Sequence, residues 1–252
     1  MTIDATTLSS LLLAPRPDLE LRAAWDDLAA VLPEVGALDM APTSVQHKDN
    51  VAHTIQVVAQ CPARLRVRLT ALLHDVGKPA TRHVEAGIVT FYHHEAVGAR
   101  LVVPALTRLG YGADLSDEVA QLVRLSGATK GSLGWSDAAV RRFAREAGPL
   151  LGDLLDFAAA DVTSRHAHKR QAVADEVAQL RRRIAAVARA DAAASWRPVV
   201  DGGAIMARYG LTPGPRVGEL LAALGSAQRA AEANAQEFDA AAAWRVLDPL
   251  VR

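Results

Sequence analysis

The chain has 252 residues, enough for one large domain or a main domain with an appendage. Hydrophobic residues make up 50% and aromatic residues only 4%, and the abundance of alanine and leucine favours helices. Lysine plus arginine and aspartate plus glutamate number 28 each, so no overall charge draws the chain to nucleic acid or anionic lipid. The single cysteine, Cys61, excludes an internal disulfide and a cysteine-rich zinc site, and it suits a reducing cytosol.

The N-terminal segment differs in composition from the rest of the chain. Residues 1–45 contain four prolines around one amphipathic stretch, Leu19 to Leu32, with Trp25 on its apolar side. We expect a packing arm over 1–45, a main domain over 46–190 and a small helical extension over 191–252. Because the first residues carry no basic and apolar signal segment, we also expect a cytoplasmic protein with no membrane partner.

A histidine and an aspartate stand side by side at the end of an apolar helix. Leucines recur at helical spacing from about residue 63, and Gly77 and Pro79 then stop the helix. His74 and Asp75 lie at this end, where two adjacent side chains can reach the same ion. A preceding helix, capped by Asp49 or the next residue, contains His53.

Further helices and one short ribbon are expected downstream. The sequence predicts a loop or two-stranded ribbon over 81–92 and a glycine-rich loop over 126–134. The predicted helices cover 96–109, 116–125 with Ser116 as its cap, 137–146 with Ser136 as its cap, and one long helix from 150 into the 180s.

That long helix carries a carboxylate on its apolar stripe. Leu150, Leu154, Phe157 and Asp161 follow at helical spacing, which puts the aspartate on the inward face. With no internal repeat and no alternation of strands and helices, the pattern predicts an all-α helical bundle.

Four groups from three predicted helices can form a metal site: His53, His74, Asp75 and Asp161. An ionised aspartate on an apolar stripe costs several kcal/mol unless it is paired or bound to a cation. Two imidazoles and two carboxylates suit a divalent ion with open coordination positions, which can activate water at neutral pH. Lys78 could neutralise a phosphate.

This arrangement resembles the HD superfamily of metal-dependent phosphohydrolases, whose signature is a distant His, a His-Asp doublet and a later Asp. It is closest to the HD and C-terminal region of bacterial CCA-adding tRNA nucleotidyltransferases. The resemblance covers roughly residues 46–225, and its segments are 46–54, 71–82, 91–99, 135–143, 160–165, 201–206 and 213–218.

The chain departs from that pattern in two ways. Such enzymes carry a nucleotide-transferring head before the HD part, whereas only 46 residues precede His47 here, so we expect no CCA addition by this chain alone. The resemblance also implies that two-metal HD proteins use extra histidines, one matching His94 and another at the position of Ser126. We therefore expect one firm metal site and a second site that is either weak or absent, with Mn, Fe, Co, Ni, Zn and Mg all open as the ion.

Five further residues are candidates for the site, each with a structural alternative. His94 is a second-site ligand, a proton donor to a leaving group, or a residue at a helix start. His47 and Lys48 contact a phosphate or lie in an exposed loop, and Arg82 and Arg165 line the pocket mouth or form salt bridges.

The leading hypothesis is a metal-dependent phosphohydrolase or phosphodiesterase that acts on a nucleotide, a cyclic phosphate or an RNA end. In this hypothesis Asp75, Lys78 and His94 are catalytic. The resemblance leaves two alternatives open: an HD-type di-iron oxygenase acting on a small molecule, and a non-catalytic module that binds tRNA or another RNA. The oligomeric state is open.

Overall fold

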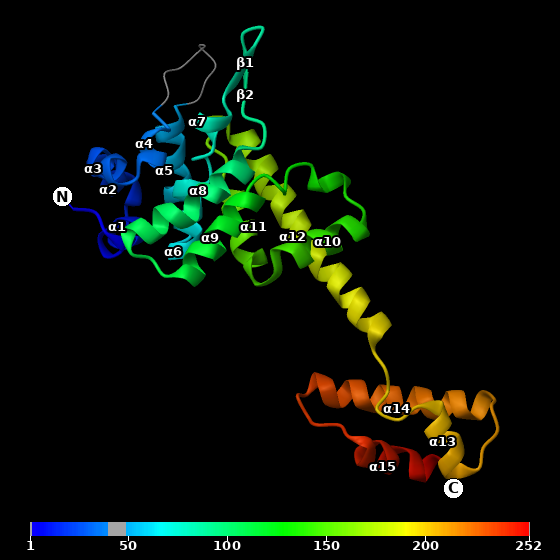
Figure 1. Ribbon diagram of the computed structural model, residues 1–252. Helices are drawn as coiled ribbons and strands as arrows, with labels where there is room; N and C mark the ends of the chain where they lie inside the picture. The colour runs from blue at the N-terminus through cyan, green and yellow to red at the C-terminus, as the bar shows by residue number, and fades with distance from the viewer. Residues whose placement is uncertain (1, 40–48, 252) are drawn as a thin grey trace. The chain divides into compact units, whose positions relative to one another are not determined.

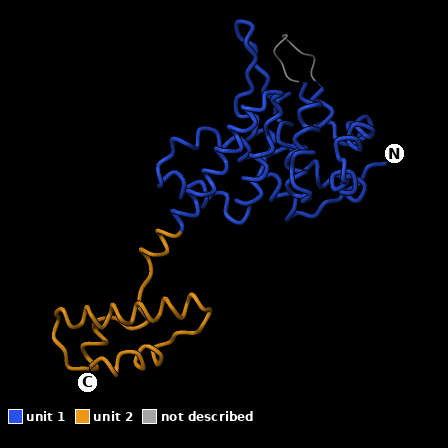
Figure 2. Tube along the Cα trace, turned by 180° about the vertical axis from the view of Figure 1, so that it is seen from behind, with its two compact units in different colours: residues 1–188 blue, residues 189–252 orange. Residues whose placement is uncertain are grey.

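The computed structural model describes residues 2–39 and 49–251. The chain divides into two compact units, residues 1–188 and 189–252, with the boundary inside one long helix (Figure 2). The expected division at residues 45 and 190 stays a prediction.

In the first unit the described residues form helices and one short two-stranded ribbon, which confirms the all-α prediction (Figure 1). The strands pair antiparallel, with Val84 opposite Val89, and the ribbon projects from the helical body. The elements are α1 (Ala5–Leu13), α2 (Pro17–Ala23), α3 (Trp25–Val31), α4 (Pro33–Gly36), α5 (Asn50–Gln60), α6 (Leu65–Leu73), α7 (Lys78–Thr81), β1 (His83–Glu85), β2 (Ile88–Thr90), α8 (His94–Leu109), α9 (Ala113–Leu125), the 3-10 turn Ser132–Gly134, α10 (Asp137–Ala147), the 3-10 turn Gly148–Leu150, α11 (Leu151–Ala160) and α12 (Ala167–Ser195).

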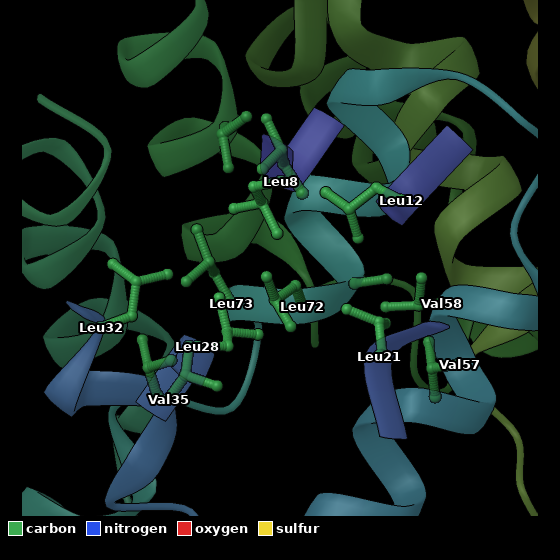
Figure 3. Packing of buried hydrophobic residues seen from close by; sticks show 14 of the residues in the cluster. Leu8, Leu12, Leu21, Leu28, Leu32, Val35, Val57, Val58, Leu72 and Leu73 are labelled. Carbon is green, nitrogen blue, oxygen red and sulfur yellow. The ribbon is translucent and has the colours of Figure 1, made fainter. Parts of the chain in front are cut away.

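The N-terminal helices pack into the main core of this unit. Leu8 and Leu12 of α1 and Leu21 of α2 are fully buried in the same cluster as Leu72 and Leu73 of α6 (Figure 3). Each buried leucine removes enough apolar surface from water to stabilise the fold by roughly 1.5–3 kcal/mol. The last two residues of α6, which directly precede His74, are thereby held in place by the apolar core.

The second unit has a separate small core. Its buried side chains come from the segment before α13 and from all three of its helices: Val200, Ile205, Leu220, Leu224, Ala243 and Leu247. The helices are α13 (Gly202–Tyr209), α14 (Pro215–Ala233) and α15 (Ala240–Val251).

Two helix boundaries predicted from the sequence are wrong. The long helix is interrupted: α11 ends at Ala160, Asp161 leaves the helical region with φ −76° and ψ 53°, and α12 begins only at Ala167. The helix α9 begins at Ala113, and Ser116 lies inside it with its hydroxyl donating to the carbonyl of Gly112, so Ser116 is not the cap. Within an established helix a serine hydroxyl can bond the preceding turn, and the cap position passes to an earlier residue.

None of the helices in residues 2–39 and 49–251 combines the length and apolarity needed to cross a lipid bilayer.

Candidate metal centre

The helix α5 carries the first candidate ligand, His53. Asp49 caps it, with its carboxylate accepting a hydrogen bond of 2.9 Å from the amide of Ala52. His53 follows one turn later and is buried. An apolar run then continues the helix into the core, which holds the histidine at a fixed depth.

The doublet, His74 and Asp75, lies at the C-terminal end of α6. His74 is the C-cap residue of the helix, and His74 and Asp75 are both almost completely buried, with exposed fractions of 3% and 2%. The next turn contains Gly77, where a Cβ would overlap the carbonyl oxygen of His94 and lie 2.6 Å from the amide nitrogen of Gly98. The glycine therefore lets the start of α8 approach the doublet directly.

Five predicted ligands come together at this point. The Nε2 atom of His74 lies 3.2 Å from Asp75 Oδ2 and 3.3 Å from His53 Nε2. The Oδ1 atom of Asp161 lies 3.3 Å from His53 Nε2 and 3.8 Å from His74 Nε2, and His94 Nε2 lies 3.6 Å from Asp75 Oδ1. The break after α11 is what turns the Asp161 carboxylate toward the two imidazoles.

Hydrogen bonds orient the three imidazole rings. His74 Nδ1 donates to the carbonyl of Ala71 at 2.8 Å, and His94 Nδ1 donates to the carbonyl of Phe91 at 2.8 Å. Because a carbonyl oxygen only accepts, each neutral ring keeps its lone pair on Nε2, which faces the cluster. The Nδ1 atom of His53 lies 2.8 Å from the hydroxyl of Thr163.

The donor set fits a divalent cation. In its neutral form His74 directs a lone pair at another imidazole nitrogen and at a carboxylate oxygen, and this arrangement needs a shared proton or cation. With bonds of about 2.1 Å, ligand atoms around one ion lie about 3.0–3.4 Å apart for right-angle to tetrahedral arrangements. His53, His74 and Asp75 form a group able to hold a metal, and the carboxylate of Asp161 is within reach of both imidazoles.

The electrostatics of the cluster also favour positive charge. Burial alone would lower the pKa of His74, but the carboxylates of Asp75 and Asp161 and the carbonyl of Ala71 together hold the pKa of His74 above its usual value. Burial alone would raise the pKa of Asp75, yet the His74 ring and then Lys78 hold it far below the ordinary range. The pKa of Asp161 is lowered against its burial, chiefly by the hydrogen bond with His53.

A pocket of about 290 Å³ opens onto the cluster. Lys78 lines it, and its ammonium group lies 2.6 Å from Asp75 Oδ2. Besides the five predicted ligands and this lysine, the lining residues are Glu95, Ser126, Gly127 and Lys130. A larger hollow of about 700 Å³ runs along α5, α11 and α12, but none of the predicted ligands lines it, so we place the site in the smaller pocket.

Of the four predicted substrate contacts, the structure describes only Arg82 and Arg165. Arg82 and Arg165 are exposed and are not among the described residues that line it. His47 and Lys48 lie outside the described residues. Substrate contact by these four residues stays a prediction.

Sequence reasoning did not identify two features of the site. The Thr163 hydroxyl partners His53 from the segment between α11 and α12, and Lys130 reaches the pocket from the loop after α9. The glycine-rich composition of 126–134 predicted a loop, but it gave no indication of where the side chain of Lys130 would lie.

The geometry agrees with the comparisons. The family model described as HD domain matches residues 45–188, more than half of the chain, and the chain belongs to the HD domain family. This family is that of metal-dependent phosphohydrolases, as expected from the doublet and its partners.

The most similar relatives include tRNA nucleotidyltransferases. The chain is 36% identical over 194 residues to the A-adding tRNA nucleotidyltransferase of Deinococcus radiodurans, covering 74% of this chain and 44% of that protein. It is 34% identical over 231 residues to the CC-adding tRNA nucleotidyltransferase of Thermus thermophilus, covering 88% and 51%. The multifunctional CCA protein of Ectopseudomonas mendocina is 37% identical over 124 residues, covering 46% and 30%. The chain thus spans about half the length, or less, of the curated relatives it matches.

Proposed function

We propose that this chain is a metal-dependent phosphohydrolase or phosphodiesterase that acts on a nucleotide, a cyclic phosphate or an RNA end. The observation that carries this proposal is the convergence of His53, His74, Asp75 and Asp161 in one pocket, with Lys78 beside them. A divalent cation held by these four side chains would supply Lewis acidity, lowering the pKa of water and polarising a phosphoryl oxygen.

The protein's own groups then bind and position the phosphate. Lys78 lines the pocket and is held by its ion pair with Asp75, and the remaining donors of its ammonium group can bind a phosphoryl oxygen. His94 carries its proton on Nδ1 when neutral, and its Nε2 faces the pocket. In the protonated form this Nε2 can give a proton to the leaving oxygen.

One ion is the simplest occupancy of this pocket. Ser126 lines the pocket at the position where the family resemblance calls for a further histidine. A serine hydroxyl is a much weaker ligand than imidazole for these ions. The alternative of a di-iron oxygenase needs the fuller histidine set and is supported less than hydrolysis.

RNA is the second candidate partner. The relatives from Deinococcus and Thermus are named for action on tRNA, which favours an RNA or a nucleotide as the phosphate carrier. A non-catalytic RNA-binding module would bind tRNA tightly without turnover in the presence of any of the candidate ions.

The experiment is a hydrolysis screen on the purified chain. Nucleoside mono-, cyclic and polyphosphates and a tRNA with a terminal phosphate are incubated with Mn²⁺, Co²⁺, Ni²⁺, Fe²⁺, Zn²⁺ or Mg²⁺, and released phosphate or opened cyclic phosphate is measured. We expect metal-dependent turnover that Asp75→Asn abolishes. The matched control is Asp117→Asn, an exposed position on α9. Unchanged turnover in a folded Asp75→Asn variant would exclude the proposed mechanism.

A further inference from the structure

The loop after α9 places a second lysine in the pocket. Lys130 lines the same cavity as Lys78 but comes from residues 126–134, a different part of the chain. Its backbone amide closes a turn onto the carbonyl of Gly127 at 3.4 Å. No hydrogen bond or ion pair joins its ammonium group to the residues that the structure describes.

This loop is held in place from α12. The carboxylate of Glu176 accepts hydrogen bonds from the amide of Ser132 at 2.9 Å and from its hydroxyl at 3.1 Å. Arg183 donates to the carbonyl of Trp135 at 2.7 Å. Lys130 precedes the first of these anchors by two residues, so the start of its side chain is fixed although its end is exposed.

The net charge of the side chains that line the pocket, counted together with a bound ion, changes from negative to positive when a divalent cation binds. Two ammonium groups, of Lys78 and Lys130, face three carboxylates, of Asp75, Asp161 and Glu95. Counting the imidazoles as neutral, the empty pocket has an excess of one negative charge, and a divalent ion converts this to an excess of one positive charge. The Lys78 ammonium shares its donors between Asp75 and an incoming anion, whereas Lys130 has all three of its donors available for the anion.

We infer that Lys130 binds the non-bridging oxygens of a terminal phosphate, so that the preferred substrate is a dianionic phosphomonoester whose binding depends on the metal ion. The inference rests on the proposed function, and it names the substrate class. A monoester carries nearly two charges above its second pKa of about 6, whereas a diester carries one, so an added ammonium group favours the monoester. Without the cation the carboxylates repel either anion.

The test uses two small probes that differ only in charge and one methyl group. Methyl phosphate and dimethyl phosphate are titrated at pH 8 into the full chain by calorimetry, with and without saturating Mn²⁺. The variants are Lys130→Met, Lys130→Arg and, as the matched control, Lys169→Met, an exposed lysine in α12 that does not line the pocket. Mn²⁺ binding itself is measured first for each protein.

The expected results separate this inference from the proposed function. Methyl phosphate binds the Mn²⁺-loaded chain more tightly than dimethyl phosphate, Lys130→Met weakens methyl phosphate binding about tenfold, and Lys130→Arg and Lys169→Met retain it. Without Mn²⁺ the affinity for methyl phosphate falls at least as far. If Mn²⁺ does not bind the unaltered chain, the proposed function fails. If Mn²⁺ binds but Lys130→Met behaves like Lys169→Met, or the diester binds as well as the monoester, the inference on Lys130 is wrong and the metal site stands.

Discussion

At the scale of single residues, the site depends on partners that fix the imidazole rings. The carbonyl of Ala71 sets the tautomer of His74, and the Thr163 hydroxyl contacts Nδ1 of His53. Such outer partners orient a ligand and raise its basicity. Loss of such a partner therefore lowers the affinity of the site for the ion without removing a ligand.

We expect Thr163→Val to weaken Mn²⁺ binding about tenfold, because the isosteric valine cannot accept the Nδ1 proton of His53. Calorimetric titration with Mn²⁺ measures the effect. Thr107→Val, at an exposed position on α8, is the control and leaves the dissociation constant unchanged. An unaltered constant for Thr163→Val would show that the hydroxyl does not orient the ligand.

Burial makes the thiol of Cys61 unreactive in the folded protein. Desolvation raises the pKa of its thiol to about 12, and the side chain is almost completely buried. Since the fraction of thiolate at pH 8 is then about one in ten thousand, the native protein reacts with a disulfide reagent such as Ellman's only on unfolding. Prompt stoichiometric labelling at pH 8 without denaturant would contradict this account, and labelling in guanidinium provides the reference.

At the scale of elements, the approach of α8 to the end of α6 brings His94 to the doublet. This approach depends on Gly77, because a Cβ there would collide with the backbone of His94 and Gly98, which cannot move aside as a side chain can.

Gly77→Ala is therefore expected to destabilise the fold by about 3 kcal/mol or more and to separate His94 from Asp75. Chemical denaturation measures the loss of stability. The control is Gly152→Ala in α11, where a Cβ meets no atom within 4 Å and the substitution stabilises the helix by up to about 1 kcal/mol. Equal stability of the two variants would mean that the elements are not in such close contact.

The sequence predicted the elements of the site better than their boundaries. Helical spacing singled out Asp161, whose carboxylate does face the two imidazoles, but the residue lies just beyond the end of α11 and not on its inward face. The cap at Asp49 and the short ribbon within 81–92 are confirmed. The end of α11 was missed because Val162, Thr163 and Ser164 include no glycine or proline to signal it. The placement of Lys130 in the pocket depends on contacts with α12, about 45 residues away, which local patterns do not contain.

At the scale of the whole molecule, the described residues form three buried apolar clusters, two in the first unit and one in the second. The candidate metal ligands all belong to the first unit, and the second unit has its own buried cluster. A ligand that binds only the folded first unit stabilises that unit by mass action, by about 2.7 kcal/mol at a hundred times the dissociation constant.

Saturating Mn²⁺ is therefore expected to slow amide hydrogen exchange in α5, α6 and α11 and to leave α13, α14 and α15 unchanged. Exchange followed by mass spectrometry resolves these segments. Equal protection of both units would indicate nonspecific binding or a single cooperative unit.

The central claim is that His53, His74, Asp75 and Asp161 hold one divalent ion. The most direct measurement is the metal content of the purified chain after Mn²⁺ loading and desalting, for the unaltered protein and for folded His74→Asn and Asp161→Asn variants. The account predicts about one ion per chain in the unaltered protein and a large loss in both variants. Equal metal content in all three proteins, or none in the unaltered chain, would contradict it.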